Sequence, residues 1–271
     1  NFGYTNMQSF SSINVNLSGG LVQNAITNAQ WYDQSGVQYS IPVNGPGTGN
    51  VNAMVMVNSP IGRSNFSIMS MTNARYNQST SYIGTGSLDS GKYYDAENVS
   101  FDYDAFNKDF PDLGNTSAFT ENKIRTTGVM QMLRLTYRND FVELVAGGMT
   151  NMSKSFYTMN AVNQKATWAN NASFEMNWTL PFGMNLIADV NYNWYNGYSS
   201  PQKSEFVWNA EITQLLFNNK CTIALRAYDL LNQAKNLTVS DVSNYHLESR
   251  SNTLGRYVVV AFTYRFGTFG N

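Results

Sequence analysis

The sequence has few of the residues from which most functional sites are built. Its 271 residues include one cysteine, Cys221, and one histidine, His246, and charged residues make up 13% of the chain. One cysteine excludes an internal disulfide, and one histidine excludes a His-rich metal centre. The net charge of −1 leaves no basic excess to neutralise phosphates. We therefore expect no metal site, no bound cofactor and no nucleic-acid partner.

Long hydrophobic runs are also missing. The most apolar stretch, Tyr257 to Phe262, is far shorter than the ~20 residues that a membrane-spanning helix requires. Residues 1–16 have neither the basic start nor the apolar stretch of a signal peptide, so we expect an exported protein to have lost its leader or to be part of a longer precursor. The chain is nevertheless 42% hydrophobic and 14% aromatic, which suits a protein whose rings lie between hydrocarbon and water.

Apolar and polar residues alternate along many segments. From Met184 to Trp194 every even position is apolar, while polar residues such as Asp189 and Asn191 fill most odd positions. Alternation with a period of two predicts β-strands. We predict ten strands, at residues 10–22, 49–58, 65–77, 124–137, 141–151, 165–180, 184–196, 204–217, 220–230 and 253–266.

The predicted connections alternate strictly in length. Tight turns fall at Pro60 to Arg63, Asn139-Asp140, Pro181 to Gly183 and Asn218-Asn219, and long polar loops at 23–48, 78–123, 152–164, 197–203 and 231–252. If the strands run up and down, all tight turns lie on one side. Outer-membrane barrels have this asymmetry, whereas the connections of a soluble sandwich mix lengths at both ends.

Turn length and face pattern agree in three hairpins and predict their registers. The predicted pairs are Ala210–Ala227 and Ile212–Leu225 across Asn218-Asn219, Phe174–Val190, Trp178–Leu186 and Leu180–Met184 across Pro181 to Gly183, and Leu135–Leu144 and Tyr137–Val142 across Asn139-Asp140. Gly183 should take the left-handed position of its turn. The first register also places Glu211 opposite Arg226 on the polar face, which predicts a cross-strand ion pair.

The polar face of these strands is mainly Asn, Ser and Thr, with few charges. A hydrated interior fits that composition better than a surface facing bulk water. We therefore predict an all-β fold, a transmembrane antiparallel up-and-down β-barrel, with residues 1–271 forming one segment of about ten strands from a larger barrel. Its location would be the bacterial outer membrane, in contact with lipid and lipopolysaccharide.

Three stretches resemble known outer-membrane proteins. Residues 256–266, with aromatic residues at alternate positions and a terminal Phe266, look like the C-terminal strand that the barrel-assembly machinery reads. Residues 42–45 with the hairpin 52–77, and residues 227–233, are similar to the β-barrels of Bacteroidetes-type TonB-dependent receptors.

The resemblance implies a 22-stranded barrel with an N-terminal plug that imports a nutrient, of which this chain supplies the last ten strands. No plug domain is recognisable in the chain, so contact with TonB would be made by a region N-terminal to it. Other outer-membrane or surface lipoprotein subunits are further expected partners. The alternative is a non-transporting barrel that serves as a structural or assembly platform in an outer-membrane complex.

Candidate sites are few, and we expect no enzyme. A self-contained barrel enzyme would have His246, near Ser243 and Ser251, as its general base, but no nucleophile motif flanks it, and a solvated loop residue is the simpler interpretation. Asp102, Asp104, Asp109 and Asp112 could hold calcium in the loop 101–112, although their spacing does not fit an EF-hand.

Two larger groups complete the candidates. Six aromatic residues of the longest loop could bind a ligand at the outer mouth or pack the loop on itself; they are Tyr93, Tyr94, Tyr103, Phe106, Phe110 and Phe119. Six charged residues of the polar face would set the electrostatics of a lumen or join neighbouring strands; they are Glu143, Glu175, Asp189, Glu205, Glu211 and Arg226.

Overall fold

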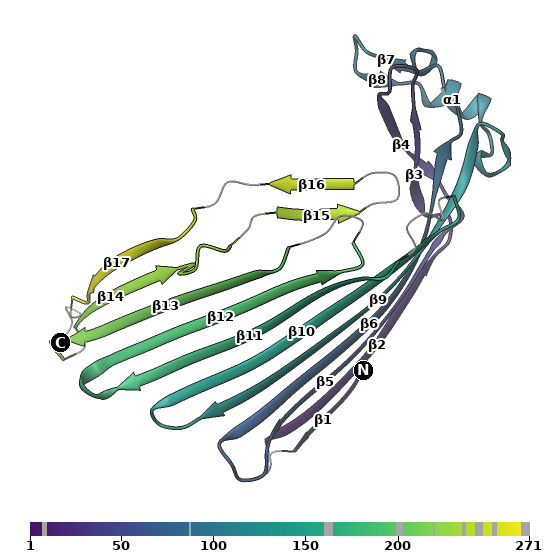
Figure 1. Cartoon of the computed structure of the whole chain (residues 1–271). Helices are drawn as coiled ribbons and strands as arrows, with labels where there is room; N and C mark the ends of the chain where they lie inside the picture. The colour runs from purple at the N-terminus through teal and green to yellow at the C-terminus, as the bar shows by residue number, and fades with distance from the viewer. Residues whose placement is uncertain are drawn as a thin grey trace, which may run out of the picture.

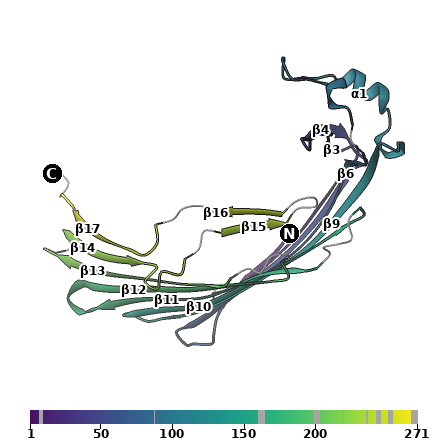
Figure 2. The ribbon, with the colours of Figure 1, turned by 45° about the horizontal axis from the view of Figure 1, so that its top comes forward.

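The main body of the protein is one large, curved sheet (Figures 1 and 2). The structure is a computed structural model that describes residues 1–6, 10–86, 88–159, 165–198, 203–218, 220–234, 237–241, 246–250 and 254–266. Neighbouring strands of the main path are antiparallel and follow chain order. They are β1 (Phe2–Asn6), β2 (Ser11–Val22), β5 (Thr48–Pro60), β6 (Phe66–Gly84), β9 (Phe119–Arg138), β10 (Val142–Tyr157), β11 (Thr167–Leu180), β12 (Met184–Asn196), β13 (Glu205–Leu216), β14 (Cys221–Tyr228) and β17 (Tyr257–Tyr264).

All ten predicted strands are confirmed as members of this sheet, and β1 joins them at one edge. β6 and β9 run seven and five residues beyond their predicted limits at 77 and 124. The extension of β6 pairs with the first residues of β9, from Gln78↔Arg125 to Gly84↔Phe119. The pairing of β6 with β9 therefore continues beyond the main sheet, into a separately packed region at its end.

Two of the three predicted hairpin registers are confirmed. Ile212 pairs with Leu225 and Trp178 with Leu186. Gly183 has the predicted positive φ of 74°. In the hairpin before Lys220, Phe217 and Asn218 have positive φ.

The register predicted between β9 and β10 is wrong by two residues, because Tyr137 pairs with Leu144. Asn139 closes this turn: its backbone N–H donates to the carbonyl of Val142 at 3.0 Å, and its side-chain oxygen accepts from the N–H groups of Phe141 and Val142 at 2.9 and 2.7 Å. The loop is therefore Asp140-Phe141 rather than Asn139-Asp140. A shift of two residues leaves every side chain on its predicted face.

The two faces of the sheet differ in chemistry and exposure. We call the face that carries Trp178, Trp208 and Phe262 the apolar face and the opposite one the polar face. These three side chains are 43%, 39% and 68% exposed, so within the described part of the chain no second layer covers them. In the described part of the chain these strands therefore form a single layer.

The sheet is open. β1 pairs with β2 and β17 with β14, and no ladder between described residues joins β1 to β17. The predicted antiparallel up-and-down order is confirmed. Closure into a barrel is not seen in this chain.

The tight turns gather at one end of the sheet and the long connections at the other (Figure 1). Two predicted polar loops, 23–48 and 78–123, are folded, and we call residues 25–45 and 82–119 the rim. The rim contains β3 (Ile26–Tyr32), β4 (Gln38–Asn44), η1 (Ser90–Lys92), β7 (Tyr94–Asp95), β8 (Ser100–Phe101), α1 (Tyr103–Asp109) and η2 (Leu113–Asn115). A further hairpin, β15 (Leu237–Asp241) with β16 (His246–Arg250), follows β14.

The hairpin β3–β4 is fixed by its turn and by its contact with β6. Asp33 accepts hydrogen bonds from the backbone of Ser35 at 2.8 Å and of Val37 at 2.9 Å, which holds the turn. β3 then joins the extended end of β6 in parallel, with Ala29 opposite Tyr82. Among the described helices, none combines the length and the apolar character needed to cross a membrane.

Candidate functional site: the polar face and the rim

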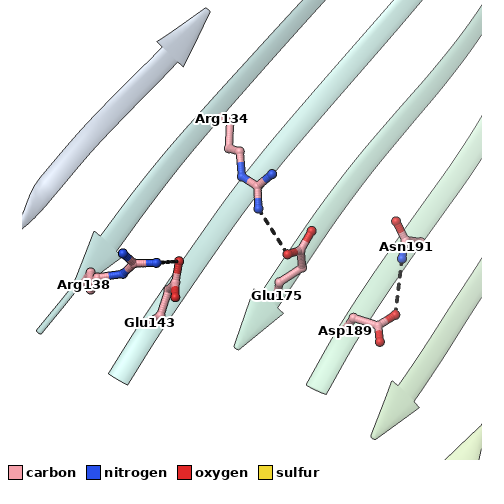
Figure 3. A network of polar contacts seen from close by, with 6 residues as sticks. All are labelled: Arg134, Arg138, Glu143, Glu175, Asp189 and Asn191. Atoms are coloured by element: carbon pink, nitrogen blue, oxygen red, sulfur yellow. Dashed lines mark hydrogen bonds and ion pairs between the residues drawn. The ribbon is translucent and has the colours of Figure 1, made fainter. Parts of the chain in front are cut away.

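A network of charged side chains lies on the polar face of β9 to β12 (Figure 3). Arg138 donates to Glu143 at 2.7 Å between adjacent strands. Arg134 reaches Glu175 at 3.2 Å across the intervening strand β10. The residue of β10 opposite Arg134 is Gly147, which has no side chain to stand between the two charges.

Asp189 continues this network onto β12 and β13. It accepts hydrogen bonds from the side-chain amides of Asn209 at 2.8 Å and Asn191 at 3.4 Å. Arg134, Glu143, Glu175 and Asp189 line one hollow of about 420 Å³. Since both arginines are paired with glutamates and Asp189 is held by amides, this part of the wall is polar with a slight negative excess.

The predicted ion pair between Glu211 and Arg226 is confirmed, with 2.9 Å between Oε2 and Nε. Glu205 lies opposite Asn193 at the start of β13, on the same face. All six predicted charged residues therefore lie on the polar face, and three of them share the hollow. The sequence analysis missed Arg134 and Arg138, although Arg134 has the parity of the polar face in its predicted strand.

The rim contains its own aromatic core. The ring of Trp31 stacks between Tyr39, with centroids 5.5 Å apart, and Phe106, 5.8 Å away, and meets Phe119 edge-on at 6.0 Å. Trp31 and Phe106 are 1% and 0% exposed. Rings that are stacked or edge-on contribute beyond the area that they bury.

The predicted aromatic group therefore packs the loop on itself. Tyr93, Phe106 and Phe119 are buried in the core, and Phe110 and Phe101 pack against it. Tyr94 is half-buried, with its ring 5.8 Å from that of Tyr39, whereas Tyr103 is 43% exposed. The sequence could not separate these two outcomes, since ring-bearing residues serve both a core and a ligand surface.

A hollow of about 400 Å³ lies in the rim between β4 and α1. Its lining includes the rings of Tyr82, Tyr103 and Phe110 and the amide of Asn107. Burial, and then the nearby carboxylates of Glu121 and Asp112, raise the pKa of Tyr82. Its phenol stays protonated at neutral pH and can donate a hydrogen bond into the hollow.

Three of the four aspartates considered as calcium ligands have separate structural roles, and the fourth, Asp104, lies in the first turn of α1. Asp102 caps α1 by accepting from the N–H of Ala105 at 2.9 Å, and Asp112 caps η2 by accepting from Gly114 at 3.0 Å. Asp109 is bound by Lys92 and by the hydroxyl of Tyr93. Within the described ranges, no three Asp, Glu, His or Cys residues are grouped so that they could hold a metal ion.

His246 begins β16, opposite Asp241. Ser243 and Ser251 lie outside the described residues.

No family model matches the chain, and no curated protein matches it either. The similarity to TonB-dependent receptors thus stays a prediction from strand and turn residues.

Proposed function

We propose that the chain is a segment of the wall of a transmembrane β-barrel in a bacterial outer membrane. Its apolar face would contact lipid and lipopolysaccharide, and its polar face would line a hydrated interior. The observation that carries the proposal is the uncovered apolar face, on which Leu17, Leu133 and Val260 are each at least half exposed. An exposed apolar surface that crosses many strands marks a contact with membrane or protein.

The open edges support a barrel larger than this chain. In the described structure β1 and β17 each have a partner on one side alone. An unpaired backbone group in hydrocarbon costs several kcal/mol, so strands within a membrane must continue around a closed ring. Further strands would therefore complete the sheet. A 22-stranded ring encloses a lumen wide enough for a plug, whereas ten strands would be nearly filled by their own side chains.

The function that fits such a wall best is nutrient uptake by a receptor similar to the TonB-dependent class. The rim would help to capture the solute, and the solute would then pass along the polar face as a plug moves. A region N-terminal to this chain would contact TonB. Catalysis has no part in this proposal.

A specific observation favours the alternative, a structural or assembly barrel. The rim is a compact unit with a buried aromatic core, which is a rigid surface suited to docking a surface lipoprotein or another outer-membrane subunit. This alternative needs neither a plug nor an open passage.

The membrane part of the proposal can be tested by spin labelling. In a Cys221→Ala background, single cysteines replace residues 184–194 of β12 in turn, and each label is exposed to oxygen and to a water-soluble nickel complex. Even positions such as Leu186 and Val190 should be accessible to oxygen, and odd ones such as Asp189 to the nickel complex. Equal access to the nickel complex on both faces would refute the membrane wall.

Two properties of the native protein distinguish the uptake role from the assembly role. The intact mass and the sequence upstream of Asn1 should reveal a plug if the chain belongs to a receptor. A native protein that closes its barrel without a plug, and that co-purifies with other outer-membrane subunits, would favour the assembly role.

A further inference from the structure

The polar face carries a patch of thioether side chains on four neighbouring strands. It contains seven of the twelve methionines of the chain. We call this group the methionine patch: Met54 and Met56 on β5, Met69 and Met71 on β6, Met130 and Met132 on β9, and Met149 on β10. Met69 lies opposite Arg134, which fixes the face of the patch as the one that carries the charged network.

The ladder aligns four of these residues in a single row. Met56 is opposite Met71, Met71 is opposite Met132, and Met132 is opposite Met149. Directly opposite residues have Cβ atoms about 4.5–5.5 Å apart. Because methionine is unbranched and has three rotatable bonds, the sulfur atoms of neighbouring strands can turn toward a common point.

The patch differs from both of its surroundings. Around it the polar face carries amides, hydroxyls and charges; Asn73, which lies between Met54 and Met130, is hydrogen-bonded to Asn52 at 3.0 Å. On the apolar face the same strands carry branched residues, such as Val55 and Leu133, and also a hydrogen-bonded polar group formed by Ser70, Thr72 and Gln131. If these positions required just an apolar side chain, branched residues such as valine and leucine would meet that requirement with better-defined rotamers. Sulfur is thus the property that distinguishes the patch.

The electrostatic surroundings allow a cation. Arg134 borders the patch beside Met69, but it is paired with Glu175. Arg75 lies one level beyond Asn73, opposite Asn52 and Gly128. The row itself has no charge, and six of the seven methionines are partly shielded from solvent while Met149 is 39% exposed. An ion could therefore reach the row from the polar side.

We propose that the methionine patch binds a soft monovalent cation of the Cu(I) class through thioethers of adjacent strands, with Met71 and Met132 at its centre. Uncharged thioethers are soft ligands that select Cu(I) over the hard cations that prefer oxygen. Binding needs no redox step, because the ion enters in its reduced state. The site stands on the ladder register alone and does not depend on uptake or on the membrane.

The test uses the complete protein in detergent with Ag(I), which has the same charge and softness and is inert to oxidation. A Cys221→Ala background removes the one thiol. Affinity is measured by calorimetry, and the methyl groups of the methionines are followed by NMR. Met71→Leu with Met132→Leu keeps the volume and should weaken binding at least about tenfold, because even indirect partners of a metal change affinity by that factor.

The control is the pair Met152→Leu and Met176→Leu on the apolar face, which should bind Ag(I) as the parent does. In the parent, the methyl signals of Met71 and Met132 should shift first, a readout that needs no substitution. Equal affinity in both double variants would overturn the proposal. So would an Ag(I) titration in which no methyl signal of the patch moves, since a merely hydrophobic patch predicts that result.

Discussion

The rim and the wall of the sheet use the same kinds of side chain in opposite ways. In the rim, Trp31 and Phe106 are buried against other rings, whereas on the wall Trp178 and Phe262 are 43% and 68% exposed. The rim thus holds a core like that of a small water-soluble domain. The wall is held by backbone ladders and needs a surrounding medium that accepts its apolar face. The stability of the rim and the stability of the wall should therefore respond to different perturbations.

The largest expected effect is the loss of a ring from the rim core. Phe106→Ala should destabilise the rim by about 3–5 kcal/mol, because the side chain is fully buried and leaves a cavity among five rings. Hydrogen exchange should then rise in residues 25–45 and 88–119 and stay unchanged in β11 and β12. Tyr103→Ala, a neighbour that is 43% exposed, is the matched control. Equal loss of protection in the wall would show that rim and wall unfold together.

A charge on the apolar face should have the next largest effect. Phe174→Arg places a guanidinium midway along β11 and should cost about 2–4 kcal/mol in a bilayer. Asn177→Arg, on the polar face opposite Glu143, is the control and should be nearly neutral. The free energy of unfolding is measured by guanidinium titration in lipid vesicles. If Phe174→Arg is as harmless as its control, the apolar face does not meet hydrocarbon.

The same contrast explains what the sequence could predict. The strands of the wall could be predicted from alternation and turn length, because both depend on residues that are close together in the chain. The Glu211–Arg226 pair could therefore be predicted from a single hairpin. The loop between β9 and β10 has the predicted length of two residues but lies one residue later than predicted, because Asn139 pairs with Val142 and its side chain accepts from the N–H groups of Phe141 and Val142. The extensions of β6 and β9 were missed because they depend on contacts made by the rim.

The rim core could not be predicted in this way. Trp31 meets Phe106 and Phe119 across a long stretch of chain, and nothing in the local pattern of residues 23–48 records those contacts. The pair Arg134–Glu175 was missed for a related reason, since it crosses a strand at Gly147 rather than joining neighbours. The row of methionines also depends on the pairing of β6 with β9, two strands that are separated in the sequence by residues 85–118.

The smallest expected effect concerns acid, and it should act on the rim. Hydrogen bonds from Lys92 and then Tyr93 hold the pKa of Asp109 below the ordinary value of a carboxyl. A lowered pKa in the folded state means that the ionised carboxylate stabilises the fold above the unfolded pKa, and that this contribution is lost as the pH falls through the folded pKa. The rim should therefore loosen below about pH 4, near the ordinary value of aspartate.

A fluorotryptophan NMR signal of Trp31 would follow this transition, because its ring packs on Phe106, which belongs to the same helix as Asp109. Asp109→Asn should loosen the rim slightly at neutral pH and flatten its response to acid, since the amide cannot titrate. Asp104→Asn, also on α1, should leave the acid response as it is. If Asp109→Asn keeps the full response, the contacts of Lys92 and Tyr93 do not stabilise the rim, and its packed rings hold it without them.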